Sequence, residues 1–275
     1  MEKHQYGQFI EFEKIETIVD TKTEHSHIEF VKTKNHGNVL LMNSEVQFST
    51  TDEHRYHEML VHPILEKCEN PMSVLILGGG DGLAAREVCK WASVQKVTIV
   101  DYDNTFVEMA KYNPEFCSLN KHVYSRSNVR YICCDAVTFM NKTSETFDVI
   151  LIDLPDPEGE LLDVYKRCIV ESRGILRENG VIGLHVGPVH PNSDFENWKT
   201  VFDLRNTLDI SYSGLGKQIT FGSVYVPSFT NEWGFLYLHD IAMKVNLDKS
   251  LIHTKYWMGG EIPSRDILDV YQRLS

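Results

Sequence analysis

The stretch that decides the fold is VLILGGGDG, residues 74–82. Four apolar residues, typical of a buried strand, run directly into a glycine-rich turn, and residues 83–88 then favour a helix. Glycines let the backbone turn tightly and let a ligand approach it closely. Strand, turn and helix in this order predict the first unit of a wound α/β sheet with a ligand at its turn.

Strand and helix patterns alternate after this stretch. Because apolar strands separated by helices form a parallel sheet covered on both faces, we expect an α/β fold with a Rossmann-like, doubly wound parallel sheet of the class I methyltransferase type. Two late runs, 220–226 and 233–239, have no helix between them and predict an antiparallel pair at one edge. The predicted strands are 74–77, 97–100, 129–134, 147–152 and 181–186, and the predicted helices are 83–92, 105–112, 161–176 and 194–208.

The N-terminal region has a different pattern. Residues 8–50 alternate apolar and polar positions, which predicts a small antiparallel sheet. Thr50 and Glu53 have the spacing of a capping box, so a helix is expected to begin with Thr50 as its N-cap. We therefore expect three parts: an N-terminal β-sheet domain (1–50), a Rossmann-like nucleoside-binding catalytic domain (51–240) and a C-terminal tail of weak periodicity (241–275).

Composition and charge exclude several classes of protein. The 275 residues are 42% hydrophobic and 24% charged, which is typical of a globular protein. The formal net charge of −12 argues against a nucleic-acid partner, which requires clustered Lys and Arg. The six cysteines form no CxxC pair, the histidines have no metal-ligand spacing, and no apolar run approaches ~18 residues. We expect a soluble, cytoplasmic protein with no metal, no disulfide and no membrane span.

Carboxylates stand at the ends of four successive predicted strands, or in the turn that follows. They are Asp81, Asp101, Asp135 and Asp153. Ligands of open α/β sheets bind outside the carboxyl ends of the strands, and an acidic residue after the second strand accepts hydrogen bonds from ribose hydroxyls. Asp81 within the turn would repel a pyrophosphate but attract a cation. The pattern therefore favours a sulfonium nucleoside, such as S-adenosylmethionine or its decarboxylated form, over a dinucleotide.

Five short motifs spread along the chain occur together in one family. They are DEHRYHE (52–58), GGGDG (78–82), REV (86–88), DA (135–136) and DLPDP (153–157). The set resembles the spermidine synthase family of aminopropyltransferases over about residues 8–240. The segment from Val226 to Phe235 looks like the thermospermine synthase branch of that family and its bacterial relatives.

The resemblance implies transfer of an aminopropyl group from decarboxylated S-adenosylmethionine to a polyamine, with release of methylthioadenosine, by a homo-oligomer such as a homodimer. Matched position by position, Asp153 would be the general base and Tyr56 would orient or deprotonate the amine. Asp156 would bind an acceptor ammonium, and Asp81, Asp101 and Asp135 would bind the donor's amine, ribose and adenine amino group. The remaining donor-site candidates are Gly78, Gly80, Gly82 and Ala136, and the remaining acceptor-site candidates are His57, Glu58, Phe229 and Trp233.

Structural roles remain open for several of these residues. Asp153 and Asp156 could shape a proline-containing turn, and Tyr56 could be a core residue whose hydroxyl bonds to the backbone. His57 and Glu58 could lie on a helix surface. Phe229 and Trp233 could be packing residues.

Departures from the family pattern lie mostly on the acceptor side. The sequence has Ser26-His27 where many members have Gln-Asp, Phe229 where spermidine synthases have Tyr, Glu160 where Pro is common, and His185 where a Gln usually begins the segment. A different acceptor is therefore an open alternative: a longer polyamine, or a tailored natural product. For the latter, aminopropyl or 3-amino-3-carboxypropyl transfer from S-adenosylmethionine to a peptide-nucleotide antibiotic of the microcin C type is a precedent. Two further classes on the same fold would be a methyltransferase, which Asp81 and Asp153 disfavour, and a silent binding protein, which Asp153 and Tyr56 disfavour.

Overall fold

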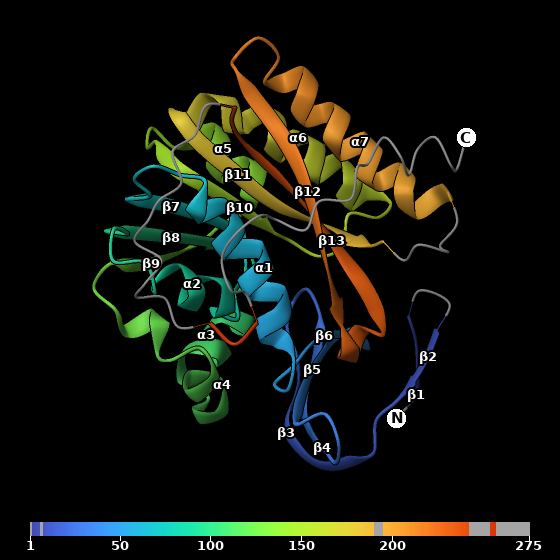
Figure 1. The fold of residues 1–275 in the computed structure, drawn as a ribbon. Helices are drawn as coiled ribbons and strands as arrows, with labels where there is room; N and C mark the ends of the chain where they lie inside the picture. The colour runs from blue at the N-terminus through green and yellow to red at the C-terminus, as the bar shows by residue number, and fades with distance from the viewer. Residues whose placement is uncertain (1, 6–7, 190–194, 242–253, 257–275) are drawn as a thin grey trace.

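A computed structural model describes residues 2–5, 8–189, 195–241 and 254–256 of the chain (Figure 1). A small antiparallel sheet from the N-terminal region lies at one end of a larger sheet that is flanked by helices. A separate two-stranded ribbon, β1 (Glu2–Gln5) and β2 (Gln8–Glu11), precedes them. Most of the expected C-terminal tail, 242–253 and 257–275, falls outside the described residues.

The N-terminal sheet has four antiparallel strands in the order in which they occur along the chain, as expected from the alternating pattern. One face of it packs against α4 (Pro114–Leu119), where the ring centroids of Phe30 and Phe116 are 4.5 Å apart. The contact fixes this sheet beside the larger one. The strands are β3 (Lys14–Lys22), β4 (His27–Thr33), β5 (Asn38–Met42) and β6 (Glu45–Ser49).

The larger sheet has seven strands in the order β12-β13-β11-β10-β7-β8-β9. The five strands from β11 to β9 run parallel, and β12 and β13 form an antiparallel pair at one edge. Both the parallel sheet and the late antiparallel pair are therefore confirmed. The strands are β7 (Ser73–Gly78), β8 (Lys96–Asp101), β9 (Val129–Cys133), β10 (Phe147–Asp153), β11 (Leu176–Pro188), β12 (Lys217–Val226) and β13 (Asn231–Asp240).

Helices cover both faces of the larger sheet, as a doubly wound fold requires. The described helices include two short ones, α4 and α5, that the periodicity did not predict, since six or seven residues are too few to establish a helical period. They are α1 (Glu53–Glu66), α2 (Leu83–Val88), α3 (Asn104–Tyr112), α4 (Pro114–Leu119), α5 (Ala136–Lys142), α6 (Glu160–Ile175) and α7 (Phe195–Ser211), with 3₁₀ turns at Val123–Ser125 and Pro227–Phe229.

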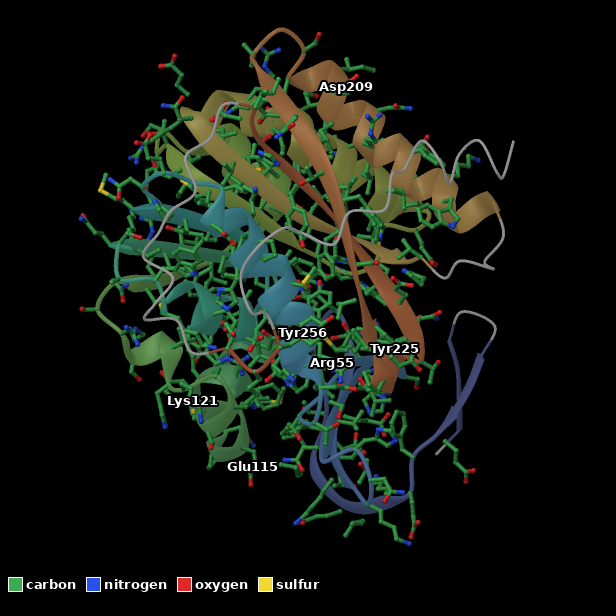
Figure 2. The ribbon with its side chains drawn as sticks, in the orientation of Figure 1. Arg55, Glu115, Lys121, Asp209, Tyr225 and Tyr256 are labelled. Atoms are coloured by element: carbon green, nitrogen blue, oxygen red, sulfur yellow. The ribbon has the colours of Figure 1, made fainter. Side chains whose placement is uncertain are left out.

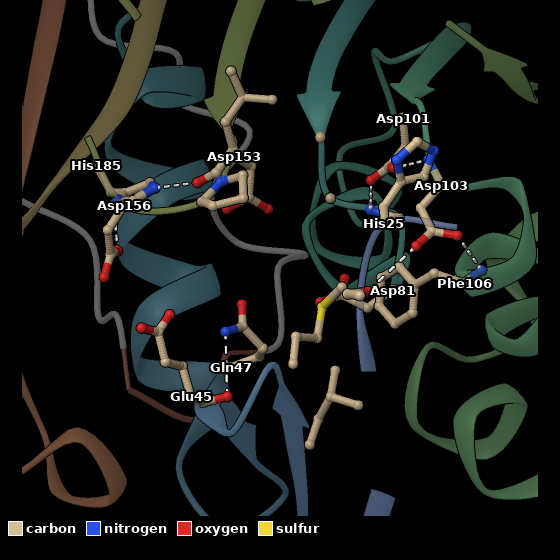
Figure 3. A pocket seen from close by; sticks show the side chains of 18 of the residues that line it. His25, Glu45, Gln47, Asp81, Asp101, Asp103, Phe106, Asp153, Asp156 and His185 are labelled. Carbon is tan, nitrogen blue, oxygen red and sulfur yellow. Dashed lines mark hydrogen bonds and ion pairs between the residues drawn. The ribbon is translucent and has the colours of Figure 1, made fainter. Parts of the chain in front are cut away.

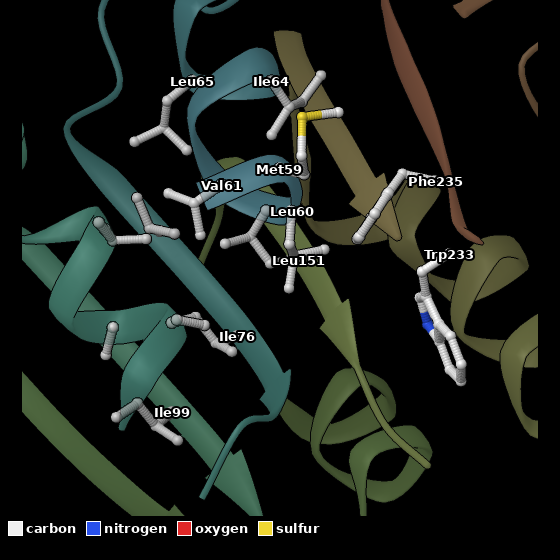
Figure 4. Packing of buried hydrophobic residues seen from close by; sticks show 14 of the residues in the cluster. Met59, Leu60, Val61, Ile64, Leu65, Ile76, Ile99, Leu151, Trp233 and Phe235 are labelled. Atoms are coloured by element: carbon white, nitrogen blue, oxygen red, sulfur yellow. The ribbon is translucent and has the colours of Figure 1, made fainter. Parts of the chain in front are cut away.

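Alternate residues of the central strands point to opposite faces and are buried on both. Ile76 of β7 packs with α1 and α2 on one face, whereas Leu75 and Leu77 belong to the cluster that includes α5, α6 and α7. Figure 4 shows the α1 side, where Leu60 of α1 lies beside Leu151 of β10. Each fully buried aliphatic side chain contributes about 1.5–3 kcal/mol, so the two clusters hold the strand ends rigidly in place.

The start of α1 differs from the predicted capping box. The N-cap is Asp52 rather than Thr50, and the Asp52 side chain makes no capping hydrogen bond. Its carboxylate instead accepts hydrogen bonds from the backbone N and the Oγ of Ser228, at 2.6 and 2.8 Å. Glu53, the other residue of the predicted capping box, instead accepts two hydrogen bonds from Arg86. The tertiary contacts of the two acidic residues thus override the local pattern.

Candidate active site

A cavity of about 220 Å³ opens at the carboxyl ends of β7, β8 and β10, and the β5–β6 hairpin of the N-terminal sheet forms its opposite wall (Figure 3). Asp81, Asp101, Asp153 and Asp156 all line it. Three of the four strand-end carboxylates singled out from the sequence therefore share one cavity with Asp156. The other predicted residues that line it are Gly78, Gly80, Ala136, Tyr56, His57, Phe229 and Trp233.

The glycine-rich turn can only be built from residues without a side chain. Gly78 has φ +82°, and a Cβ there would lie 2.1 Å from the carbonyl oxygen of Asp153. A Cβ at Gly80 would lie 2.6 Å from Oδ2 of Asp101, the atom that accepts a hydrogen bond from Gly80 N at 3.1 Å. The turn and the end of β8 are thus locked together. This brings Asp101 beside the turn that carries Asp81.

The carboxyl groups of the cavity are held in their protonated form to unusually high pH. Burial raises the pKa of Asp81 and of Asp101 to about 6. Burial, with the charge of Glu158, raises the pKa of Asp156 to about 7, and burial also raises the pKa of Asp153. A cationic ligand would relieve this cost, because an opposite charge favours the ionised carboxylate. Clustered carboxylates of this kind are suited to a cation.

Asp153 and Tyr56 form the closest side-chain pair in the centre of the cavity. The Tyr56 hydroxyl, on α1, donates a hydrogen bond to Oδ1 of Asp153 at 2.7 Å. Burial and the charge of Asp153 raise the pKa of Tyr56 well above 10, so the phenol stays protonated at neutral pH. Tyr56 is therefore a hydrogen-bond donor that orients the carboxylate, and the hydroxyl does not bond to backbone as the core alternative required.

His57 carries a buried positive charge into the same cavity. Its Nδ1 lies 2.7 Å from the carbonyl oxygen and 3.0 Å from Oε2 of Glu53. Burial opposes the charge, but the hydrogen bond to Glu53 and the nearby Asp81 raise the pKa of His57 to about 9. Arg86 holds Glu53 through two hydrogen bonds of 2.9 Å. This arrangement excludes the simple helix-surface interpretation of His57.

The far end of the cavity is built from late segments of the chain. His185, on β11, is buried, and burial lowers its pKa to about 4, so the ring is neutral. Its Nε2 lies 2.7 Å from the carbonyl oxygen of Leu154, and its Nδ1 accepts a hydrogen bond from Nε1 of Trp233 at 3.3 Å. The same Nδ1 lies 4.0 Å from Oδ1 of Asp156. Phe229 packs on Trp233 with ring centroids 4.6 Å apart.

Three predicted site residues lie outside the lining of this cavity. Glu58 is buried on another side of α1, and its carboxylate accepts hydrogen bonds from the backbone N of Lys255 and of Tyr256, both at 2.7 Å. Asp135 is exposed and caps α5 through the backbone N of Thr138 at 2.8 Å. Gly82 is the N-cap of α2. Two backbone amides thus hold the Glu58 carboxylate outside the lining of this cavity.

The segment that Glu58 holds, residues 254–256, lies along α1 (Figure 2). Arg55 stands beside it, with its guanidinium 5.4 Å from the Tyr256 ring centroid and Nη1 donating to the carbonyl oxygen of Tyr225 at 3.3 Å. Residues 55–58 of the DEHRYHE motif therefore have two different roles. Tyr56 and His57 face the cavity, and Arg55 and Glu58 hold neighbouring chain segments.

Several residues that line the cavity were not among the site residues predicted from the sequence. Asp103 caps α3 through Phe106 N and accepts a hydrogen bond from Thr23 at 2.6 Å, which ties the N-terminal sheet to the end of β8. Glu45 and Gln47 enter from the β5–β6 hairpin. Their signal was weak, because a polar residue on an alternating strand is expected to face solvent. Glu45 and Gln47 reach the cavity because the two sheets lie against each other, and the local sequence pattern does not predict that contact.

In 2–5, 8–189, 195–241 and 254–256, no group of three or more His, Cys, Asp or Glu side chains is arranged to hold a metal ion. Over the same ranges, no helix combines the length and the hydropathy that crossing a bilayer requires.

Comparison with known proteins gives consistent results. Residues 53–249 match the spermine/spermidine synthase domain. The chain is 37% identical over 221 residues to a polyamine aminopropyltransferase 2 of Bacillus cereus, covering 80% of this chain and 57% of that protein. It is 30% identical over 245 residues to a polyamine aminopropyltransferase of Sulfolobus acidocaldarius, covering 86% of this chain and 76% of that protein. It thus spans little more than half the length of the Bacillus relative.

Solved structures agree on the fold. A spermidine synthase crystallised with the transition-state analogue AdoDATO superimposes with a TM-score of 0.74 at 22% identity, covering 86% of this chain and 79% of that chain. The spermidine synthase of Thermotoga maritima gives 0.72 at 22% identity, covering 86% and 78%. From the domain match over most of its length and the similarity to the Sulfolobus enzyme, we conclude that the chain belongs to the spermine/spermidine synthase family.

Proposed function

We propose that the protein is a polyamine aminopropyltransferase, which moves an aminopropyl group from decarboxylated S-adenosylmethionine to an amine and releases methylthioadenosine. The observation that carries the proposal is the Tyr56–Asp153 hydrogen bond of 2.7 Å inside a cavity that Asp81, Asp101 and Asp156 also line. The names of the relatives, polyamine aminopropyltransferases, support the same reaction class.

The donor end fits a cationic nucleoside. The glycine turn leaves the backbone open beside Asp101, whose carboxylate is suited to the ribose hydroxyls. Asp81 is suited to the donor's amine, and Ala136 at the start of α5 leaves room for the adenine. Asp135 stays a candidate for the adenine amino group, because its neighbours Cys134 and Ala136 line the cavity.

The chemistry of the transfer needs little from the protein beyond position and a base. When bound, the sulfonium donor supplies an activated carbon with a good leaving group. The amine nitrogen bonds to that carbon, the carbon–sulfur bond breaks with its electron pair on sulfur, and the amine loses a proton. Asp153 accepts this proton, and Tyr56 keeps the accepting oxygen aimed. Asp156 binds a remaining ammonium of the acceptor, which holds the reactants in line.

The donor is proposed to be the decarboxylated form. Asp81 lies within the turn and lines the cavity, and its carboxylate would repel the extra carboxylate of intact S-adenosylmethionine. The same repulsion disfavours the aminocarboxypropyl transfer kept open from the sequence. We also propose, from the resemblance, a homo-oligomer and the division into parts at 1–50, 51–240 and 241–275.

Product analysis tests the proposal. The purified protein is incubated with either decarboxylated or intact S-adenosylmethionine, together with putrescine or spermidine, and products are measured by mass spectrometry. Methylthioadenosine and an amine heavier by one aminopropyl group are expected with the decarboxylated donor. Production of S-adenosylhomocysteine would instead identify a methyltransferase, and no product with either amine would contradict the proposal.

A further inference from the structure

Glu45 brings a carboxylate to the cavity from the wall opposite the strand ends. It begins β6 and lines the cavity together with Asp156. In Figure 3 its carboxylate points from the hairpin into the space on the side where Asp156 and His185 enter. Its carbonyl oxygen accepts a hydrogen bond from Nε2 of Gln47 at 3.3 Å, which fixes the hairpin locally.

The Glu45 carboxylate lacks a partner within the part of the chain that the structure describes. No described Lys, Arg or His pairs with it, whereas the exposed carboxylate of Glu13, also in the N-terminal region, is paired with Lys34 at 3.0 Å. The acceptor end thus holds two carboxylates, Asp156 and Glu45, on opposite walls. Like charges that face one cavity are unfavourable unless a cation lies between them.

The number of ammonium groups on the acceptor can be compared with the number of carboxylates at this end of the cavity. The attacking nitrogen lies at Asp153 and must be neutral. A diamine then has one remaining ammonium, which Asp156 neutralises. A linear triamine has two, and Glu45 provides the second carboxylate. The neutral ring of His185 and the buried rings of Phe229 and Trp233 give the intervening methylenes an apolar wall.

We propose that Glu45 is an acceptor-specificity residue that favours amines with three or more nitrogens over diamines. The inference rests on the proposed aminopropyl transfer. Because Glu45 is exposed at the mouth of the cavity, its attraction to an ammonium is that of a screened ion pair, which corresponds to a change in KM of about fivefold at most.

Steady-state kinetics with saturating decarboxylated S-adenosylmethionine test the proposal. Glu45→Gln is compared with the wild type on spermidine and on putrescine. The KM for spermidine should rise, by up to about fivefold, with kcat and the KM for putrescine unchanged. Glu16→Gln is the matched control, since Glu16 is an exposed carboxylate of β3 in the same sheet and does not line the cavity; it should change neither KM.

The outcomes separate the two proposals. If the wild type transfers aminopropyl groups but Glu45→Gln leaves both KM values unchanged, or raises both equally, the inference on Glu45 is wrong and the proposed function stands. If the wild type releases no methylthioadenosine with either amine, the proposed function fails first. Raising the salt concentration should reduce the difference between wild type and Glu45→Gln on spermidine, because salt screens an exposed pair.

Discussion

Two groups of carboxylates, one in the cavity and one on the neighbouring helices α1 and α2, behave in opposite ways. Asp81 and Asp156, in the cavity, are only partly buried, yet their pKa values rise to about 6 and about 7. Glu53 on α1 and Glu87 on α2 are almost fully buried, yet their pKa values fall to about 2. Burial raises all four, so the difference lies in the partners. Arg86 contacts both glutamates.

The presence or absence of cationic partners distinguishes carboxylates with a structural role from those of a ligand site. Glu87 also accepts from Nε2 of His62 at 2.9 Å and from Nζ of Lys90 at 2.5 Å, so its charge is balanced within the fold. The cavity carboxylates have backbone amides, a phenol and the charge of His57, which leaves an excess of negative charge. Carboxylates that a fold desolvates without pairing indicate a cationic ligand. Deeply buried but paired carboxylates indicate structure.

The largest effect should follow from Asp153→Asn. The amide keeps the shape and can still accept the Tyr56 hydrogen bond, but it has no basicity to accept a proton. A general base contributes about 10²–10⁴-fold, so kcat should fall by that factor while the thermal midpoint stays close to wild type. The measurement is methylthioadenosine release at saturating donor and acceptor.

Asp163→Asn is the matched control for this variant. Asp163 is an exposed carboxylate in the first turn of α6, and it does not line the cavity. Its loss should leave kcat unchanged. A kcat for Asp153→Asn within threefold of wild type would remove Asp153 from the proposed role.

Glu53→Gln should produce the largest loss of stability. The change leaves the buried guanidinium of Arg86 and the ring of His57 without their shared anion. Breaking a buried ion pair at one partner costs about 3–5 kcal/mol, and urea unfolding would measure it.

Asp156→Asn tests whether an unpaired carboxylate of the cavity differs in its effect on stability from the paired Glu53. Because burial raises the pKa of Asp156 to about 7, its ionised form is disfavoured in the folded state, and that cost is present above pH 7. The variant should therefore be as stable as wild type, or more stable, at pH 8. Equal destabilisation by Glu53→Gln and Asp156→Asn would mean that pairing does not separate the two groups.

The end of the cavity that we propose for the donor was predictable from sequence, and the end that we propose for the acceptor was only partly so. Asp81 and Asp101 belong to a single strand–turn–helix–strand unit, and the parallel pairing of its two strands places their carboxyl ends together. Gly78 is required by a positive φ and a backbone contact, so sequence and geometry agree there. The parallel direction of the central strands was also predictable, because apolar strands separated by helices form a parallel sheet.

The acceptor end is assembled from segments far apart in the chain. Glu45 comes from the N-terminal hairpin, His185 from β11 and Trp233 from β13. No local pattern reports that these meet. Glu58 shows the converse: it belongs to the same motif as Tyr56, but the helix turns its carboxylate toward the amides of residues 255 and 256. The predicted capping box was wrong for a similar reason. The carboxylates of Asp52 and Glu53 accept hydrogen bonds from Ser228 and Arg86, which are distant in the sequence.

Asp81→Asn should weaken donor binding by a smaller factor. Oδ1 of Asp81 accepts the backbone N of Leu83 at 2.8 Å, and an amide oxygen can keep that bond. What is lost is the charge that faces the donor's amine. A hydrogen bond to a charged group contributes about 1.5–3 kcal/mol, so the Kd for decarboxylated S-adenosylmethionine should rise about 10- to 100-fold.

The same variant should narrow the preference between donors. Intact S-adenosylmethionine loses its repulsion from Asp81, so its affinity should fall less than that of the decarboxylated form, or rise. Isothermal titration with both compounds measures this. A parallel loss for both donors would show that Asp81 does not discriminate between them.

The smallest effect is the release of protons when the donor binds. With a pKa of about 6, Asp81 is half protonated at pH 6 in the free protein. A cation favours the ionised form and lowers this pKa, so binding must expel the proton. Affinity should fall as the pH drops below 6, by at most about 1.4 kcal/mol per pH unit for one group, and be constant above about pH 7.

Titration in two buffers of different ionisation enthalpy measures this proton count directly. The release should be largest at pH 5–6 and vanish by pH 8, and Asp81→Asn should reduce it, leaving the share of Asp101, whose pKa is also about 6. Glu53 provides the internal contrast: with a pKa of about 2, it is ionised throughout this range and contributes nothing. Donor binding with no proton release at pH 6 would mean that the cavity carboxylates are already neutralised within the fold, and the distinction between the two groups would disappear.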